Sequence, residues 1–177
     1  ISIMSELRTN RIIPRDGLTS GTGIAGGIIQ IKQTIKKDQF TTTSVVSSGG
    51  YVDITGLSVA ITPTRSDSKV LVKAVIYNSN ANAVNFFRLL RGSTFIEQPS
   101  GTSSSGASYN AHAFAYYNAN NWQDSTVIEI LDEPATTSET TYKIQMGVTS
   151  ATGTINKFYN TSNYYGISTI TAMEVSG

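Results

Sequence analysis

Residues 50–77 read GYVDITGLSVAITPTRSDSKVLVKAVIY, and this stretch decides the fold class. In residues 57–62, apolar Leu, Val and Ile alternate with Ser, Ala and Thr, a period of two that indicates a strand with one buried face. Pro63 ends this strand, and residues 65–68 (RSDS) are typical of a turn. Residues 69–77 carry apolar side chains on both faces, which indicates a fully buried strand. We expect the two strands to pair as an antiparallel hairpin.

The same signals recur along the rest of the chain. Further strands are expected at residues 28–37, 84–91, 94–98, 111–117, 125–132, 141–148 and 165–175, separated by Asn, Gly and Ser clusters. No segment shows the 3.6-residue period of an amphipathic helix. Eight to ten short strands at this spacing predict an all-β fold, a single antiparallel, jelly-roll-like β-sandwich domain at residues 28–177.

Composition narrows the classes of function. The chain has 177 residues, of which 39% are apolar and only 14% charged, with a net charge of +1. This balance gives no electrostatic basis for nucleic-acid binding. The absence of cysteine excludes disulfides, thiolate catalysis and cysteine-ligated zinc. No apolar run approaches the roughly 20 residues of a membrane span, and no secretory signal is visible at residues 1–10, so we expect no membrane insertion.

Residues 1–27 differ from the rest of the chain. Isolated apolar residues stand among arginines, Pro14 prevents a regular element, and five glycines follow. Such a segment has too little apolar surface to fold on its own, so we expect an extended arm that lies along another surface. The residues expected to anchor it are Leu7, Arg8, Arg11, Ile12, Ile13 and Arg15.

Residues 21–26 (GTGIAG) match G-x-G-x-x-G, the consensus of a dinucleotide-binding loop. That loop needs a buried strand before it and a helix after it. Here Pro14 and Gly17 interrupt the preceding stretch, and a period-two pattern follows. We therefore interpret these glycines as a flexible hinge between arm and domain and expect no cofactor.

Few residues are candidates for catalysis. His112 is the only histidine, and its place in the alternating NAHAFAYY favours a packed or surface strand position over a metal or triad role. Glu129 and Asp132 stand near the end of a strand, where we expect ordinary solvated charges. No catalytic residue and no metal site is predicted, so we do not expect an enzyme.

Several aromatic residues adjoin asparagine-rich turns, in NANNWQD (118–124) and NTSNYYG (160–166). Sugars are often held by stacking on aromatic rings beside amide side chains. Many of these rings must point into the core or a subunit interface. The best candidates for a surface or glycan-binding role are Trp122, which we expect at a loop tip, and Tyr164 and Tyr165.

Four stretches together resemble a known family. SELRTNRIIPRDGL (5–18), GGIIQIKQTIKKDQFTTTS (26–44), the segment 51–76 quoted above and STITAMEV (168–175) are similar to tail-fibre-like virion structural proteins of bacteriophages, especially of cyanophages and other marine phages. The resemblance spans nearly the whole chain. It implies a location in the virion, a homotrimer, and an arm that docks on tail or capsid proteins.

The resemblance leaves the exact role open. Long fibres carry repeats, a shaft or a coiled coil, and this chain has none, so the resemblance implies a short fibre or knob for host-surface attachment. The aromatic residues named above add a host cell-surface glycan as its expected partner. The alternative is a trimeric capsid decoration (cement) protein that stabilises the head. A glycan hydrolase is a more distant alternative.

Overall fold

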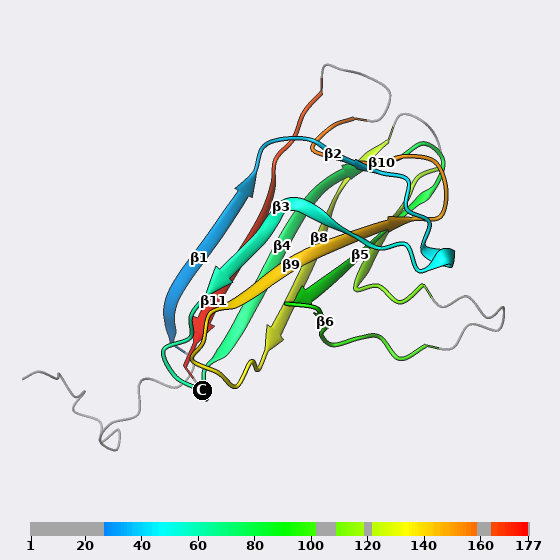
Figure 1. Ribbon diagram of the computed structural model, residues 1–177. Coiled ribbons are helices and arrows are strands. Elements are labelled where there is room, and N and C mark those ends of the chain that lie inside the picture. The colour runs from blue at the N-terminus through cyan, green and yellow to red at the C-terminus, as the bar shows by residue number, and fades with distance from the viewer. Residues whose placement is uncertain (1–26, 102–108, 119–121, 159–163, 177) are drawn as a thin grey trace, which may run out of the picture.

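The computed structural model describes residues 27–101, 109–118, 122–158 and 164–176, and within them two antiparallel sheets pack face to face (Figure 1). The first sheet contains β1 (Ile28–Lys36), β2 (Phe40–Thr42), β4 (Lys69–Ser79), β8 (Gln123–Asp132), β10 (Gly153–Ile155) and β11 (Ser168–Val175). The second contains β3 (Val52–Ile61), β5 (Val84–Arg91), β6 (Thr94–Phe95), β7 (Ala113–Tyr116) and β9 (Thr140–Val148). The predicted all-β sandwich is confirmed.

The strand order shows how the chain moves between the sheets. The first sheet runs β1-β11-β4-β8; β10 pairs with the end of β4 on the same side as β11, and β2 pairs with β10. The second sheet runs β3-β9-β5, with β6 and β7 both on the far edge of β5. The chain changes sheet on either side of β3, between β4 and β5, on either side of β8, and between β9 and β10. Such alternation is typical of jelly rolls. The predicted arm, including its six anchoring residues and the glycine hinge at 21–26, lies outside the described residues.

The predicted hairpin of residues 51–62 and 69–77 is wrong. β3 pairs with β9 in the second sheet, whereas β4 pairs with β8 and β11 in the first. The two strands lie in different sheets on either side of the core, where Leu57 and Val72 are both fully buried. Each strand buries its apolar side against the opposite sheet, so the alternating pattern alone does not decide whether two such strands pair in one sheet or lie in different sheets. Residues 62–68 are therefore a connection between sheets.

The strands expected at residues 84–91 and 94–98 form a hairpin. β5 and β6 pair through Leu90–Phe95 and Arg91–Thr94. Gly92 adopts a φ of +58°, which glycine reaches without strain. β6 ends at Phe95, sooner than the pattern predicts.

The core lies between the sheets. Its members are apolar residues at alternate positions of facing strands, including Leu57, Val59, Ile61, Val70, Val72, Ile76, Phe87, Leu89, Tyr142, Ile144, Met146, Ile170 and Ala172. The prediction that residues 69–77 are buried on both faces is wrong for the single chain. Val70, Val72 and Ile76 point into the core, but Leu71 and Val75 are only half-buried and lie on the outside of the sheet.

Candidate functional surfaces

The three aromatic residues predicted for a surface role are all exposed. Trp122 is 59% exposed immediately before β8, and Tyr164 and Tyr165 are 61% and 58% exposed shortly before β11. The ring of Tyr164 packs edge-on against Phe158 at 5.9 Å. Trp122, Tyr164 and Tyr165 are called the tip residues below.

Tyr77 connects the two segments that carry the tip residues. Its hydroxyl donates to the side-chain carbonyl of Gln123, the neighbour of Trp122. Its ring also lies against Gly166, the neighbour of Tyr165, so closely that a methyl group on Gly166 would overlap the ring atoms. The tip residues thus stand at the same end of the first sheet, beside the last outward residue of β4.

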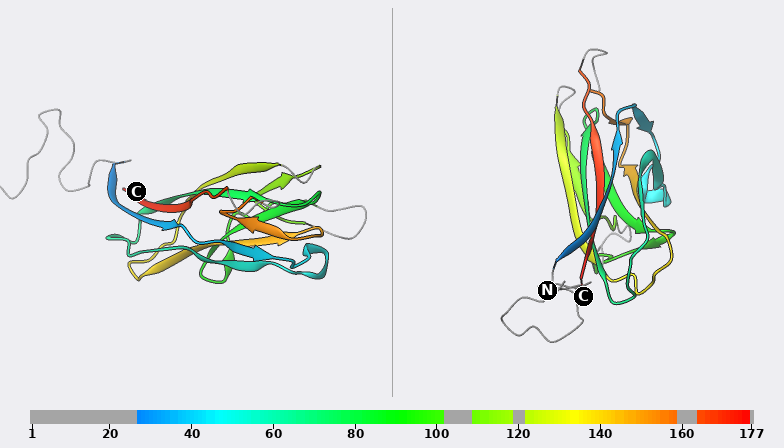
Figure 2. Two further views of the ribbon diagram at one scale, coloured as in Figure 1. Left: turned by 90° about the horizontal axis from the view of Figure 1, so that it is seen from above. Right: turned by 90° about the vertical axis from the view of Figure 1, so that its left-hand side faces the viewer.

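The tip lies at the end of the sandwich opposite to Ile28, where β1 begins. The strand register pairs Ile28 with Val175 at one end of the first sheet and Lys36 with Ser168 at the other. Trp122 adjoins Gln123, which pairs with Ser79 at this second end. Figure 2 shows the start of β1 and the end of β11 together at one end of the molecule.

Beneath the tip the core is polar. The buried Tyr117 hydroxyl donates to the Asn78 side-chain oxygen at 2.6 Å, and the Asn85 amide donates to the same oxygen at 3.0 Å. The Asn80 amide in turn donates to the side-chain oxygen of Asn85 at 2.7 Å. Burial raises the pKa of Tyr117, so its hydroxyl stays protonated and donating. This directional network holds the ends of β4 and β5 in fixed positions.

The second sheet carries an aromatic cluster that the sequence analysis did not select. Phe114 and Tyr116 on β7 are 69% and 65% exposed. Phe86 on β5 lies 5.5 Å from Tyr109 and 6.1 Å from Phe114, between ring centroids. The signal was present in the sequence, since alternation over residues 113–116 places Phe114 and Tyr116 on one face. Deciding that this face is the exposed one needs the tertiary structure.

His112 has a structural role, in line with the prediction. The backbone N–H of Leu89 donates to its Nδ1 at 2.8 Å, and its Nε2 lies 2.8 Å from the carbonyl oxygen of Ile96. Burial lowers the pKa of His112, which favours the neutral ring with the proton on Nε2. Both ring nitrogens are therefore occupied by backbone groups.

The prediction that Asp132 is an ordinary solvated charge is wrong. Asp132 is 5% exposed, its carboxylate accepts two hydrogen bonds from Nη1 of Arg91 at 2.8 and 2.9 Å, and it accepts a third from the Tyr142 hydroxyl at 2.6 Å. The partners stand on strands of the second sheet, so the charge links the two sheets at their edge. Glu129 fits the prediction better, with an exposed carboxylate 3.1 Å from Lys73.

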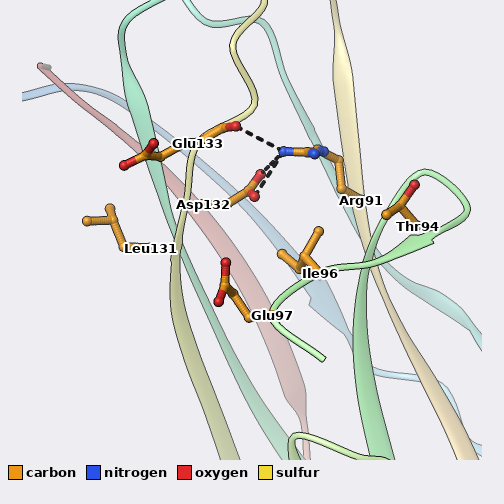
Figure 3. A pocket seen from close by; sticks show the side chains of 7 residues that line it. All are labelled: Arg91, Thr94, Ile96, Glu97, Leu131, Asp132 and Glu133. Carbon is orange, nitrogen blue, oxygen red and sulfur yellow. Dashed lines mark hydrogen bonds and ion pairs between the residues drawn. The ribbon is translucent and has the colours of Figure 1, made fainter. Parts of the chain in front are cut away.

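A hollow of about 330 Å³ adjoins this ion pair (Figure 3). It is lined by Arg91, Thr94, Ile96, Glu97, Leu131, Asp132 and Glu133. Two of its three carboxylates are engaged, since Arg91 binds Asp132 and Glu133 binds Lys69 at 2.6 Å. Among the described residues no group of three or more His, Asp or Glu side chains is placed to hold a metal ion.

The outer face of the first sheet is a second distinctive surface. Cross-strand partners on β1, β11, β4 and β8 form three rows on it. The first row is Ile31, Met173, Leu71 and Leu131; the second is Gln33, Thr171, Lys73 and Glu129; the third is Ile35, Thr169, Val75 and Val127. An apolar row and a row that is apolar except for Thr169 thus enclose one polar row. Ile31, Ile35, Val127 and Leu131 are each 47–57% exposed.

Comparisons with known proteins add no relative. No protein-family model matches the chain, and no curated protein sequence matches it significantly. In the described part of the chain, no helix is long and apolar enough to cross a membrane. The class that the fold defines is an antiparallel jelly-roll β-sandwich.

Proposed function

We propose that this protein is a homotrimeric virion protein of a bacteriophage, a short fibre or knob that is attached to the particle by residues 1–27 and binds the host surface with its opposite end. The observation that carries the proposal is the position of the tip residues. They stand at the end of the sandwich that lies away from Ile28, where the chain enters the domain. A sandwich domain that is attached at one end presents its other end to its surroundings.

The chemistry of the tip supports a carbohydrate ligand. Trp122 offers an exposed indole, and Tyr164 and Tyr165 offer exposed phenol rings in the same region. Exposed rings stack on the apolar faces of sugars, while neighbouring hydroxyl and amide groups bond to sugar hydroxyls. The polar network under the tip keeps these rings on a rigid support, which lowers the entropic cost of binding.

The proposal assigns binding rather than catalysis. The single histidine is held by backbone groups, and the most buried carboxylate at a hollow, Asp132, is neutralised by Arg91. A hydrolase of glycans needs two carboxyl groups free to serve as acid and as base or nucleophile. Three carboxylates line the hollow; Asp132 and Glu133 are engaged in ion pairs, and the remaining one, Glu97, does not by itself supply the required pair.

Position on the particle tests the proposal. Antibody raised against residues 28–177 should label the tail of the phage particle by electron microscopy. Labelling of the capsid lattice would instead support the decoration protein, and unlabelled particles would refute a virion role altogether.

Binding by the tip is tested by Trp122→Ala in the full chain. Because Trp122 is 59% exposed, we expect the melting temperature to change by less than about 2 °C, while binding to host cells or to their surface polysaccharide falls at least tenfold. Trp122→Phe is the matched control, since it retains a ring for stacking, and it should bind within about threefold of the wild type. Undiminished binding by Trp122→Ala would place the ligand elsewhere, with the Phe114 cluster as the next candidate.

A further inference from the structure

We infer that the outer face of the first sheet is the surface through which copies of this chain associate, around an axis parallel to the strands. This inference rests on the proposed homotrimer and names the surface that forms it. The face spans four strands and consists of the three rows defined above. The occupant is a second copy of the same chain for four reasons, which concern β1, the polar row, the register of the rows and the arm.

The first reason is that β1 has its polarity reversed. Its isoleucines Ile31 and Ile35 point outward and are 57% and 49% exposed. Its inward side carries Gln30, which donates to Thr62 O at 2.7 Å, and Lys36, whose side chain is fully buried and pairs with Asp38 at 2.6 Å. An edge strand of a solvated sheet ordinarily does the opposite, with apolar residues inward and polar residues toward water. The reversal is explained if another subunit covers the outer face.

The second reason is that the polar row can be buried without leaving a charge unpaired. Lys73 and Glu129 form an ion pair within the chain at 3.1 Å. The Gln33 side-chain amide donates to the Thr171 hydroxyl at 2.8 Å. Burial of an unpaired charge would oppose association strongly, whereas a row of paired groups between two mainly apolar rows opposes it much less.

The third reason is that the rows match when copies are parallel. Rotation about an axis parallel to the strands keeps every row at its own height, so that β1 of one copy meets β8 of the next. Ile31 then faces Leu131 and Ile35 faces Val127, apolar against apolar. In the middle row Gln33 faces Glu129, and its amide can donate to the carboxylate.

An antiparallel arrangement lacks this complementarity. A two-fold axis that runs along the rows, at right angles to the strands, would place Lys73 on Lys73 and Glu129 on Glu129. Like charges stacked in a subunit contact cost several kcal/mol. Charge complementarity therefore favours the parallel arrangement.

The fourth reason is the exit of the arm. β1 begins at Ile28, beside Val175 and at one edge of this face. Parallel copies that associate through the face place their Ile28 residues at the same end of the assembly. Arms that start together can bind neighbouring sites on one particle, which raises the avidity of attachment.

Light scattering on the purified full-length protein gives the first test. The wild type should have three times the chain mass of 19.0 kDa. Ile35→Glu and Val127→Glu place an unpaired charge in the third row, and each should reduce the mass to that of one chain. Ala60→Glu is the matched control, since Ala60 is exposed on β3 of the other sheet, and it should keep the wild-type mass. Far-UV circular dichroism establishes that each variant is folded.

Disulfide crosslinking gives a second test that does not depend on disrupting the protein. The chain has no cysteine, so Ile31→Cys combined with Leu131→Cys introduces the only thiols. Within one chain these positions are separated by β11 and β4, about three strand spacings of 4.8 Å, beyond the reach of a disulfide. Under oxidation the double variant should form covalent trimers on non-reducing gels, and each single variant should not.

The outcomes separate the two proposals. Loss of the trimer in Ile35→Glu or Val127→Glu, or covalent trimers of the double cysteine variant, supports this face. A wild type that is monomeric in solution overturns both the homotrimer and this interface. A trimer that survives both glutamate variants and gives no crosslink overturns only this interface and leaves the proposed function standing.

Discussion

At the scale of the residue, the ion pair of Arg91 and Asp132 stands out because it is nearly enclosed. The Asp132 side chain is 7% exposed, and the Arg91 side chain is 32% exposed. Burial raises the pKa of Tyr142, and the hydrogen bond to Asp132 raises it further, so the Tyr142 hydroxyl keeps the proton that it donates. The three groups form one unit at the edge of the sandwich, and removing one member leaves the others unsatisfied.

Asp132→Asn should therefore destabilise the domain. The neutral amide leaves the Arg91 guanidinium without its counter-charge. We expect the free energy of unfolding to fall by about 2 kcal/mol. This loss is smaller than that for a fully buried ion pair because Arg91 is partly exposed. Urea denaturation followed by fluorescence measures it. Asp67→Asn removes an exposed pair with Arg65 and should change stability by less than about 0.5 kcal/mol. Equal effects of the two substitutions would contradict a special role for Asp132.

At the scale of the element, Gly147 on β9 allows the 3₁₀ turn at Val46–Ser48 to lie against the second sheet. A methyl group at this position would come within 2.5 Å of Val46 Cγ1 and 2.6 Å of the Gly50 carbonyl oxygen. The Val148 N–H donates to the Ser44 carbonyl at 2.9 Å and fixes the same approach. Glycine is therefore required at position 147 because no side chain fits between the turn and the strand.

Gly147→Ala should cost about 2 kcal/mol of stability, because the turn must move away from β9 to admit the methyl group. Thermal and urea denaturation measure the loss. Gly101→Ala is the matched control, since a methyl group there meets nothing within 4 Å, and its effect should stay below about 0.5 kcal/mol. A Gly147→Ala variant as stable as the control would show that the turn relaxes freely.

Glu174 joins three elements at the end of the sandwich near Ile28. It lies on β11, and its carboxylate accepts a hydrogen bond from Gln30 of β1 at 2.6 Å and two from Thr64, each at 2.7 Å. Burial alone would raise the pKa of Glu174, but the hydrogen bonds from Gln30 and Thr64 outweigh it and hold the pKa below the ordinary value of 4.5. The ionised form is thus the one that the fold stabilises.

This shift predicts a loss of stability in acid. A carboxyl group whose pKa is lower in the folded than in the unfolded state stabilises the fold above its unfolded pKa, and the contribution is lost as the pH falls through the folded value. The free energy of unfolding should therefore decrease below about pH 4.5. Glu174→Gln should be less stable at pH 7 but lose less on acidification, as urea titrations at a series of pH values would measure. Parallel pH profiles of variant and wild type would contradict this role.

At the scale of the whole molecule, the described strands enclose a core made of their own residues. The core cluster is made of residues between Ile54 and Ala172, and the strands that enclose it begin at Ile28. Gly27 takes part through its carbonyl, which accepts from the Ser176 N–H at 2.9 Å. Stability and attachment are thus expected to reside in different parts of the chain.

A chain that begins at Gly27 should therefore fold and associate as the full chain does. We expect a melting temperature within about 3 °C of that of the full chain, the same mass by light scattering, and no incorporation into particles. Differential scanning calorimetry, light scattering and blotting of purified particles check the three expectations. An unfolded product would show that the arm belongs to the folding unit, and normal incorporation would place the docking surface on the sandwich.

The sequence by itself determined the strands and the fold class. Each strand that the pattern predicts appears in the structure near its predicted position. The reason is that side chains alternate between the two faces of a strand, and this alternation can be read from residues that are adjacent in the sequence. The exposure expected of Trp122, Tyr164 and Tyr165 followed in the same way from nearby turn residues. Short β2 and β10, of three residues each, carry too few alternations to be seen.

Only the tertiary structure decided which strands pair and which sides are buried. An alternating pattern tells which residues share a face, but not whether that face meets the core, water or another subunit. For this reason β3 and β4 were predicted as neighbours in one sheet, and Asp132 was predicted to be exposed to water. The sequence pattern also did not show that Ile31 and Ile35 point away from the core. Pairing and burial depend on residues far apart along the chain, and these meet only when the two sheets close on each other.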